Sequence, residues 1–381
     1  MAAEDPRWMA RALELARCGL GETNPNPMVG CILVKSGRMV GRGWHGRAGG
    51  PHAEVQALRA AGGAARGATA YVTLEPCAHQ GRTPPCAPAL LQAGVRRVVA
   101  ALRDPNPVVN GRGLASLRRA GVEVVVGVAA DEAAALNERF VIAARLGRPF
   151  VMLKAAMTLD GRIATAAGES KWITAAPLRR RARALRRLHD GVAVGVGTVL
   201  ADDPLLLPRP RTRRPFHRVI FDSRLRTPLR SRLVSSARDS PLWIVTTEAA
   251  AGREALEARG VRVLAAPAQA GQVDLARALA ALRAEGLWSL MVEGGSDLLG
   301  ALLAARLFDQ VALFRAPLLL GGRRSRPAFG GPDPARLSHG VRLTAHSPIV
   351  GPRSTAVSPA AAADGAYEIW YPAGVRYGRT R

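Results

Sequence analysis

Four side chains in the first quarter of the sequence are of the types that bind a metal ion and move protons: His52, Glu54, Cys77 and Cys86. One neutral imidazole and two thiolates give zinc three protein ligands and leave a fourth position for water, as in catalytic zinc sites. Bound zinc lowers the pKa of its water to about 7, so hydroxide is available at neutral pH. Glu54 lies two residues beyond the histidine, and we expect it to stay off the metal and transfer protons as the catalytic residue.

The secondary structure predicted around these residues brings them to one edge of a sheet. His52 begins a helix predicted over 52–62, and a strand follows over 68–76. Cys86 lies in the first turn of a helix predicted over 84–94. Helix N-termini favour thiolates, because the positive end of the helix dipole lowers the pKa of a nearby thiol.

Each of these residues has an ordinary structural interpretation when it is taken alone. A cysteine is often a buried thiol, and a histidine at a helix start is often a cap or a core residue. Together, with an acid at the right offset, they favour a zinc centre with His52, Cys77 and Cys86 as ligands. Cys18 and Cys31 have no ligand-spaced partner and are expected to be structural.

The order His-x-Glu, then Pro-Cys and a second Cys, is typical of zinc-dependent base deaminases. Eight residues separate the two cysteines in EPCAHQGRTPPC (75–86). With TNPNPMVG (23–30) and GWHGRAGGPHAE (43–54) before it, this segment resembles the deaminase half of the bifunctional deaminase/reductase family of riboflavin biosynthesis. Family members often carry a third cysteine where this chain has Ala78. The resemblance makes Cys77 and Cys86 the ligands, so we expect this difference to leave the metal site intact.

The same resemblance implies that Asn26 and His45 contact the pyrimidine or its ribose phosphate. An asparagine in a turn and a histidine in a loop are equally ordinary as structural residues. Both interpretations stay open at this stage.

In the second half, the residues alone give weaker motifs. VAVGVGTV (192–199) and LMVEGGSDLLGALL (290–303) each read as a strand that runs into a glycine turn. Free N–H groups at such a turn or helix start can bind phosphate. Neither segment matches the Gly-x-Gly-x-x-Gly dinucleotide motif well, so a nucleotide site and a simple tight turn both remain open.

Four segments in order resemble motifs of the reductase half of the same family: 154–161, 168–174, 198–204 and 292–295. The resemblance implies a dihydrofolate-reductase-like fold that uses NADPH. On that match, the residues that line the dinucleotide are Ala156, Trp172, Thr198, Asp202, Ser223, Gly295, Ser296, Asp297, Leu298, Leu299, Gly300 and Ala301. The residues that hold the substrate are Ser170, Arg186, Leu206, Arg209 and Glu293.

The residue types suit these roles. The guanidinium groups of Arg186 and Arg209 match the oxygens of a ribose 5-phosphate, and Glu293 can accept hydrogen bonds from sugar hydroxyls or base amines. Trp172 can pack against a flat cofactor, although a tryptophan beside a strand is also a common core residue. Hydride transfer itself is the chemistry of cofactor and substrate, which the protein orients and shields from water.

Two positions depart from the family pattern. This chain has Arg183-Ala-Leu-Arg186 where many relatives have His-x-Leu-Arg, and Leu207-Pro208 where many have a threonine before the matching arginine. Pro208 is expected to alter the approach of Arg209 to a ligand. Lys154 opens the first reductase motif without an assigned catalytic role, and an ion pair is its structural alternative.

Strands and helices alternate through both halves, so the fold class is α/β. We predict a cytidine-deaminase-like α/β/α sandwich, the zinc-dependent pyrimidine deaminase domain, over 1–147. A dihydrofolate-reductase-like α/β domain with a larger sheet, the NADPH-dependent reductase domain, is predicted over 148–381. Within them we expect one helix over 131–147, a strand over 191–197 and a loop over 203–215, which is rich in proline and arginine.

The 381 residues carry a net charge of +25, which invites a nucleic-acid interpretation. All but three of the 54 basic residues are arginine, and they are scattered among alanine, glycine and proline. Aromatic residues make up only 4%, with no run in which they alternate with basic residues, as single-stranded nucleic-acid binders require. An arginine-rich solvated surface is therefore favoured over a nucleic-acid partner.

The N-terminal segment has no apolar signal core, and four cysteines are too few for a disulfide-rich secreted domain. No apolar stretch approaches the roughly 20 residues that a membrane-spanning helix requires. We therefore expect a cytoplasmic enzyme with no membrane partner. The oligomeric state is left open, and a homo-oligomer is compatible with the sequence.

The expected function is two steps of riboflavin synthesis on a small pyrimidine ribose phosphate, with Zn²⁺ and NADPH as cofactors. The first is hydrolytic deamination of 2,5-diamino-6-ribosylamino-4(3H)-pyrimidinone 5′-phosphate. The second is reduction of the ribosyl group to ribityl, which gives 5-amino-6-(5-phosphoribitylamino)uracil. The alternatives are a zinc deaminase acting on RNA or DNA bases and a deaminase whose second domain binds nucleotides without turnover.

Overall fold

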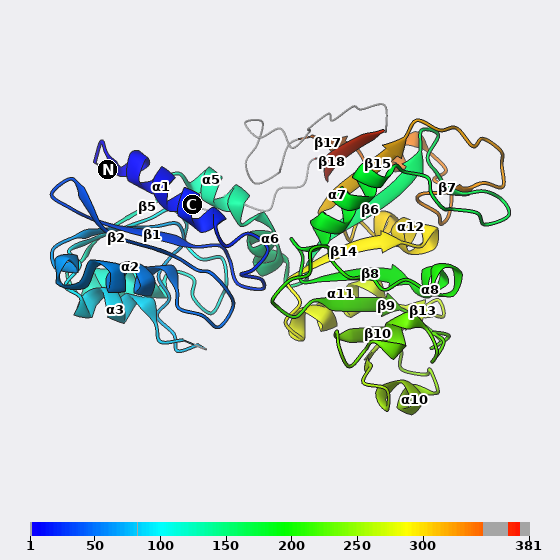
Figure 1. Cartoon of the computed structure of the whole chain (residues 1–381), viewed down its shortest axis with the longest axis horizontal. Helices are drawn as coiled ribbons and strands as arrows, with labels where there is room; N and C mark the ends of the chain where they lie inside the picture. Colours follow the sequence, from blue (N-terminus) through cyan, green and yellow to red (C-terminus); the bar gives the residue numbers. More distant parts are fainter. Residues whose placement is uncertain (1, 82, 346–364, 374–381) are drawn as a thin grey trace. The chain divides into compact units, whose positions relative to one another are not determined.

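The chain folds into two compact units in the computed structural model (Figure 1). The first unit ends at Leu146 and the second begins at Gly147. The small, polar and proline-dotted sequence of 347–364 predicts a loop, which lies outside the described residues. Those described are 2–81, 83–345 and 365–373.

The first unit is built on a five-stranded mixed sheet in the order β2-β1-β3-β4-β5. β1 pairs antiparallel with both β2 and β3, whereas β3, β4 and β5 run parallel. The strand predicted over 68–76 is present as β3, although it ends at Val72. The strands are β1 (Gly30–Lys35), β2 (Arg38–Trp44), β3 (Thr69–Val72), β4 (Arg97–Ala100) and β5 (Glu123–Val126).

Helices cover both faces of this sheet, which confirms the predicted sandwich (Figure 1). One face packs against α2, α3 and α4, and the core between them includes Leu33, Val72, Leu90 and Leu117. On the other face α1 packs against β1 and β3, and α5 packs against α1. The helices are α1 (Asp5–Arg17), α2 (Ala53–Ala61), η1 (Gly62–Ala65), α3 (Cys86–Gln92), α4 (Arg112–Arg119), α5 (Ala130–Leu136) and α6 (Glu138–Leu146).

The single helix predicted over 131–147 is wrong, because the chain breaks into α5 and α6 at Asn137. This residue leaves helical geometry, with φ −108° and ψ 26°. Its side-chain oxygen accepts from the Met28 amide at 2.8 Å, and its amide nitrogen donates to the Met28 carbonyl at 2.9 Å. The break thus satisfies the backbone of a loop more than one hundred residues earlier in the chain.

The second unit has a nine-stranded sheet in the order β11-β10-β9-β8-β14-β6-β15-β18-β17. The strands from β11 to β15 are parallel, and β18 and β17 add antiparallel pairs at one edge. The strands of this sheet are β6 (Phe150–Thr158), β8 (Gly191–Gly195), β9 (His217–Phe221), β10 (Leu242–Thr247), β11 (Arg262–Ala266), β14 (Ser289–Gly294), β15 (Gln310–Ala316), β17 (Leu343–Thr344) and β18 (Ala366–Pro372). Two short pairs lie outside it: β7 (Arg162–Ala164) with β16 (Arg326–Pro327), and β12 (Ala268–Gln269) with β13 (Gln272–Val273).

Alternating residues of these strands pack into two hydrophobic cores, one on each face of the sheet. Ala193 and Val219 face a core with α11 and α12, whereas Val192 and Ile220 face a core with α8, α9 and α10. Among the described residues, no helix is long and apolar enough to cross a membrane. The remaining elements are α7 (Ala176–Arg186), α8 (Val196–Asp202), α9 (Arg232–Ser235), α10 (Arg253–Glu257), α11 (Leu275–Ala284), α12 (Ser296–Ala304) and η2 (Leu337–His339).

The strand predicted over 191–197 ends at Gly195, where α8 begins instead of a simple turn. One glycine and three β-branched residues, at 196–199, hide this short helix in the sequence, because all four disfavour helix by propensity. The helix forms because Val196 and Val199 are buried against the core of the unit. It carries Thr198 and Asp202, two of the residues expected to bind the cofactor.

In the first unit, Asp5 is a buried carboxylate that ties α1 to the sheet. Its two oxygens pair with the guanidinium of Arg97 on β4 at 2.8 and 2.9 Å, and the Tyr71 hydroxyl donates to it at 3.0 Å. The hydrogen-bonded Arg97 guanidinium lowers the pKa of Asp5 to about 2, although burial opposes this shift. Ionised Asp5 therefore stabilises the folded unit.

We expect Asp5→Asn to reduce the free energy of unfolding by about 2 kcal/mol near neutral pH, since a lowered carboxyl pKa contributes stability of that order. The contribution is present above the unfolded-state pKa of about 4 and is lost as the pH falls toward about 2. Urea unfolding at several pH values measures this difference. Glu14→Gln, at an exposed position of α1, is the control. A difference from wild type that stays constant down to about pH 3 would contradict this role of Asp5.

Candidate active sites

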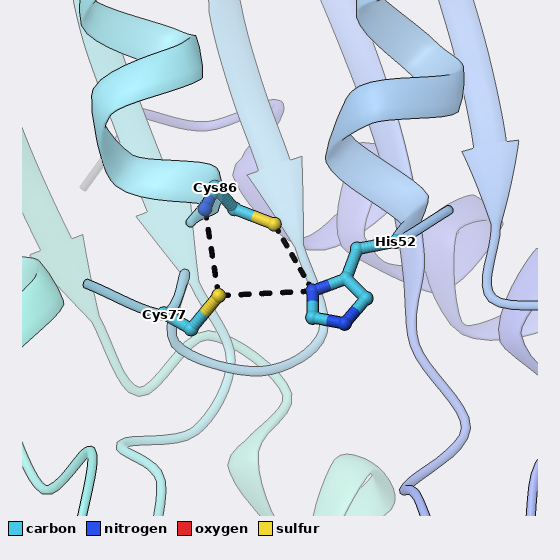
Figure 2. Close-up of side chains that lie close together, drawn as sticks. All are labelled: His52, Cys77 and Cys86. Carbon is cyan, nitrogen blue, oxygen red and sulfur yellow. Dashed lines mark hydrogen bonds between the residues drawn. The ribbon is translucent and has the colours of Figure 1, made fainter. Parts of the chain in front are cut away.

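In the first unit, His52, Cys77 and Cys86 meet at the starts of two neighbouring helices (Figure 2). His52 is the N-cap of α2, and Cys86 is the first residue of α3. Cys77 lies between them in the loop that follows β3. The backbone amide of Cys86 donates to the Cys77 sulfur at 3.4 Å, which fixes the two sulfurs beside each other.

The geometry of these three donors suits a zinc ion. His52 Nδ1 lies 3.2 Å from Cys86 Sγ and 3.7 Å from Cys77 Sγ. Tetrahedral zinc bonded to one nitrogen and one sulfur at ordinary lengths places those two atoms about 3.6 Å apart. All three ligand atoms lie within 4.8 Å of one another. One imidazole and two thiols are also the soft donor set that zinc prefers.

Thr83 orients the imidazole of His52, which the sequence did not indicate beyond its place in GRTPPC. The Thr83 hydroxyl lies 3.1 Å from Nε2, on the side of the ring that faces away from the cysteines. A hydrogen bond from Nε2–H to this hydroxyl leaves Nδ1 as a lone-pair donor. Such outer partners fix the tautomer and the ring plane of metal-binding histidines.

The two thiols lie within hydrogen-bonding distance of each other. A hydrogen bond from the Cys86 thiol, aided by His52, holds the pKa of Cys77 below its usual range, although burial opposes the shift. The pKa of Cys86 is raised, because its proton is held by the Cys77 sulfur and the group is buried. The surroundings therefore favour the thiolate at Cys77.

Glu54 is buried in the first turn of α2, with 3% of its surface exposed. Burial raises its pKa to about 7, and nearby His52 opposes the shift. A carboxyl group with this pKa can both accept and donate a proton near neutral pH. The other two cysteines lie apart from the trio, since Cys31 is buried on β1 and Cys18 is exposed.

Asn26 and His45 lie together beside this cluster. Asn26 Nδ2 lies 3.1 Å from His45 Nε2, and His45 Nδ1 lies 3.2 Å from the Pro51 carbonyl. The His45 and His52 rings meet edge to face, with their centroids 5.3 Å apart. Burial lowers the pKa of His45. A neutral His45 that donates to Pro51 can accept from Asn26.

A second buried carboxylate, Glu75, fixes the loop next to Cys77. It accepts backbone hydrogen bonds from Asp104, Gly111, Gly113 and Leu114 at 2.8 to 3.4 Å. Gly113 is required here, since a Cβ on it would lie 1.7 Å from the Pro76 carbonyl. The sequence does not indicate a role for Glu75, because its partners lie 29 to 39 residues further along the chain.

The second unit contains a cavity of 1380 Å³ at the carboxyl ends of β6, β8, β9 and β14. Most residues expected at the reductase site line it. Those expected cofactor residues are Ala156, Trp172, Thr198, Asp202, Ser223, Gly295, Ser296, Asp297, Leu298, Leu299 and Ala301. The expected substrate residues that line it are Ser170, Arg186 and Glu293.

Three expected residues are not among those that line the cavity. Gly300 packs on backbone instead, since a Cβ there would lie 1.7 Å from the Gly330 carbonyl. Leu206 is buried in the core on the α9 side of the sheet. Arg209 is exposed on the loop that follows Pro208.

Arg186 and Glu293 form an ion pair at one end of the cavity. Arg186 Nε and Nη2 donate to the two carboxylate oxygens at 2.5 and 2.8 Å, and Nη1 donates to the Leu207 carbonyl at 2.7 Å. Burial opposes ionisation of Glu293, but Arg186 outweighs it and holds the pKa of Glu293 below its usual range. Lys154, which the sequence left without a role, lies close to this pair, and burial lowers its pKa.

Two glycines shape the part of the cavity wall where the cofactor is expected to bind. Gly294 ends β14 and Gly295 is the N-cap of α12. A Cβ on either glycine would lie 3.3 to 3.6 Å from the Thr198 hydroxyl of α8. Gly295 also has φ +80°, which a side chain would disfavour. This turn brings the starts of α8 and α12 to the cavity, where free N–H groups and helix dipoles favour an anion such as a pyrophosphate.

Polar and aromatic residues complete the cavity wall. Asp202 pairs with Lys171 at 2.8 Å, and the Ser223 hydroxyl donates to Gln272 Oε1 at 3.0 Å. Trp172 is 65% exposed, so it is not a core residue, and the Arg179 guanidinium lies 4.4 Å from its ring centroid. The cavity of 1380 Å³ is larger than typical ligand pockets, which measure about 300–1,000 Å³, so it has room for a dinucleotide. The glycine turn also fits a dinucleotide.

Comparison with protein families gives a match in each unit. Residues 2–102 match the cytidine and deoxycytidylate deaminase zinc-binding region, and residues 149–349 match the RibD C-terminal domain. The fold of the chain is thus a cytidine-deaminase-like domain followed by a reductase domain of the dihydrofolate-reductase-like type, as the resemblance implied. RibD-type reductase domains use NADPH, and the deaminase domain is of the zinc-binding type.

Relatives match over most of their length. The riboflavin biosynthesis protein RibD of Actinobacillus pleuropneumoniae is 44% identical, over 89% of this chain and 90% of the relative. RibD of Escherichia coli strain K12 is 46% identical, over 84% of this chain and 89% of the relative.

Two solved structures of relatives are similar to this chain over nearly its whole length. RibD of Acinetobacter baumannii is 38% identical and superposes with a TM-score of 0.85, covering 97% of this chain and 99% of that one. The deaminase/reductase of Thermotoga maritima is 34% identical with a TM-score of 0.79, covering 97% and 98%. This chain therefore belongs to the RibD family, the bifunctional deaminases and reductases of riboflavin biosynthesis.

Proposed function

We propose that this enzyme deaminates 2,5-diamino-6-ribosylamino-4(3H)-pyrimidinone 5′-phosphate and then reduces its ribosyl group to ribityl, giving 5-amino-6-(5-phosphoribitylamino)uracil. The Thermotoga maritima relative is described as a diaminohydroxyphosphoribosylaminopyrimidine deaminase and 5-amino-6-(5-phosphoribosylamino)uracil reductase. Deamination belongs to residues 1–147 and reduction to residues 148–381. The observation that carries the first step is buried Glu54 beside the His52, Cys77 and Cys86 donors.

In this proposal His52, Cys77 and Cys86 hold zinc, which activates a water molecule when it is bound. Glu54 takes a proton from the attacking water and delivers it to the exocyclic nitrogen. The carbon–nitrogen bond breaks and ammonia leaves, so the amine is replaced by a carbonyl oxygen. Burial of Glu54 supports this role, because it raises the pKa to about 7 and allows the proton to move both ways.

Asn26 and His45 are proposed to contact the pyrimidine or its ribose phosphate. Their positions beside His52 support this, since the two side chains and the imidazole form one polar wall. Burial lowers the pKa of His45 and so favours the neutral ring, although the hydrogen bond to the Pro51 carbonyl opposes this shift. A neutral ring costs less to desolvate against a flat base than a charged one.

For the second step, the cavity of the second unit is proposed to bind NADPH and the deaminated substrate side by side. NADPH supplies hydride, and the protein orients both molecules and excludes water. The cofactor residues are those assigned by the resemblance, and the glycine turn at Gly294 and Gly295 supports a pyrophosphate beside it. The end of the cavity with Ser170, Arg186 and Glu293 is proposed for the substrate.

The proposed partners are small phosphorylated pyrimidines rather than nucleic acid. The proposed compartment is the cytoplasm. The oligomeric state is left to measurement, with a homo-oligomer compatible with the sequence.

Cys77→Ser is expected to lower bound zinc to well below one ion per chain and to abolish deamination, because a thiolate ligand is lost. Reduction of the deaminated substrate with NADPH should continue. Metal analysis of the purified variant, with the two activities assayed in parallel, measures this. Cys18→Ser is the matched control, since Cys18 is exposed and apart from the cluster. Zinc-free protein that still deaminates would exclude the zinc mechanism.

Glu54→Gln should keep the metal but lose deamination by about 10²- to 10⁴-fold, the usual worth of a general acid–base group. Zinc content and NADPH-dependent reduction should match the wild type. The measurement is ammonia release from the diaminopyrimidine substrate, with exposed Glu14→Gln as control. Full turnover of the Gln variant would remove Glu54 from the mechanism.

Gly197→Leu tests the cofactor site without disturbing the fold. Gly197 lines the cavity, and a Cβ on it would meet no heavy atom within 4 Å. The leucine side chain should occupy cofactor space and raise the Kd for NADPH at least about tenfold, a change of about 1.4 kcal/mol. Calorimetric titration with NADPH measures it, and Gly63→Leu, also in open space, is the control. Unchanged NADPH affinity would place the cofactor elsewhere.

A further inference from the structure

The loop that carries Asn26 has few backbone donors of its own. Residues 24–29 lie between α1 and β1 and form neither helix nor strand. Pro25 and Pro27 lack a backbone N–H, so they cannot donate a hydrogen bond that would fix this segment. The Asn26 amide donates to the Thr23 carbonyl at 2.9 Å, which closes one turn within the loop. The position of the loop against the rest of the unit therefore depends on contacts with other elements.

Asn137 supplies such a contact from the break between α5 and α6. Its side-chain amide bonds to both backbone groups of Met28, accepting from the N–H at 2.8 Å and donating to the carbonyl at 2.9 Å. Two residues of neighbouring antiparallel strands exchange a pair of hydrogen bonds in the same way. Asn137 is only 4% exposed, so water competes little for these bonds. One buried side chain thus holds a peptide of the loop on both sides.

The anchor itself is rigid. Near one helical turn before it, Ala133 and Ala134 of α5 are buried, and near one turn after it Val141 and Ile142 of α6 have no exposed surface. The backbone amide of Asn137 donates to the Ala133 carbonyl at 3.2 Å, and its carbonyl accepts from the Val141 amide at 2.9 Å. Because the helices on both sides are packed into the unit, Asn137 cannot follow the loop if the loop moves.

Met28 lies between two contacts that lead to the proposed pyrimidine site. Two residues before it, Asn26 Nδ2 lies 3.1 Å from His45 Nε2. One residue after it, the Val29 carbonyl accepts from the backbone amide of His45 at 2.8 Å. The residue that Asn137 holds is therefore at the centre of the short segment that places Asn26 and His45 against each other.

We propose that Asn137 is a positioning residue of the deaminase site, which sets the affinity for the pyrimidine by holding Asn26 and His45 in place. This inference rests on the proposed function, in which those two residues contact the pyrimidine or its ribose phosphate. Asn137 acts through Met28 and takes no part in the chemistry. Without Asn137, the loop occupies its binding position for only part of the time, and the apparent affinity falls in proportion.

The test measures ammonia release by the zinc-loaded, full-length enzyme at a series of concentrations of the diaminopyrimidine substrate. Asn137→Ala should raise KM about tenfold, as expected for the loss of two buried hydrogen bonds. The kcat, the zinc content and NADPH-dependent reduction should stay within about twofold of the wild type. Partial unfolding would lower kcat instead, because it reduces the fraction of active enzyme.

Asp5→Asn is the matched control. It weakens a buried contact of the same unit, with Arg97 and Tyr71, that does not involve the loop. Its KM should therefore equal that of the wild type, although its stability is lowered. Urea unfolding of both variants establishes that each is folded under the conditions of the assay.

A double-mutant cycle then shows whether Asn137 acts through Asn26. Asn26→Ala should itself raise KM, because a proposed contact to the pyrimidine is lost. In a chain that already carries Asn26→Ala, Asn137→Ala should raise KM by at most about threefold further, because the loop has less left to position. A residue that only stabilises the fold would give the same fold change in both backgrounds.

An unchanged KM in Asn137→Ala, a loss confined to kcat, or equal fold changes in the two backgrounds would overturn the role of Asn137 and leave the proposed function standing. An unchanged KM in Asn26→Ala would remove Asn26 from the proposed substrate contacts, and this inference with it. Zinc-loaded wild-type enzyme that releases no ammonia would overturn the proposed function itself.

Discussion

Burial of charged side chains is the constraint around which both sites are arranged. A charge removed from water is costly unless the protein supplies hydrogen bonds or an opposite charge. Glu75 receives four backbone N–H groups, and Asp309 is held by Arg148 and by the Val151 amide. These satisfied carboxylates fix loops and strand ends.

Buried or half-buried charges with weaker compensation lie at the two sites. Glu54 has no arginine or lysine ion-pair partner within the described residues, and its pKa is raised to about 7. Arg183 faces more positive than negative charge at the cavity wall. In the proposed mechanism, Glu54 uses this weak compensation, because its carboxyl group accepts and donates a proton near neutral pH.

The sequence predicted those elements and residue clusters that local patterns in the chain determine. Apolar periodicity located α2 and α3. The spacing of His52, Glu54, Cys77 and Cys86 indicated that these side chains converge, because a helix start and a strand end have fixed directions. Prediction from the sequence failed where contacts between residues far apart in the chain determine the local structure. The break at Asn137 exists because of Met28, and the orientation of His52 depends on Thr83. Neither contact leaves a periodic signal.

The reductase site shows a second limit. Arg186 and Glu293, which the resemblance assigns to the substrate, both line the cavity, but residue identity does not reveal that they bind each other. Arg183, Leu207 and Pro208, the positions where this chain departs from the family pattern, lie next to one another around Arg186 and Arg209. The Leu207 carbonyl accepts a hydrogen bond from Arg186, and buried Pro208 precedes exposed Arg209. Arg183 makes no hydrogen bond or ion pair with the residues that the structure describes.

The most direct test of the whole account is mass spectrometry of the products formed by the zinc-loaded enzyme from the diaminopyrimidine ribose phosphate, with and without NADPH. Without NADPH, the account predicts only the deaminated ribosyl compound, in which an amino group is replaced by oxygen. With NADPH, it predicts that this compound gains two hydrogens and becomes the ribityl product. Unchanged substrate in both reactions, or no reduced product when NADPH is present, would contradict the account.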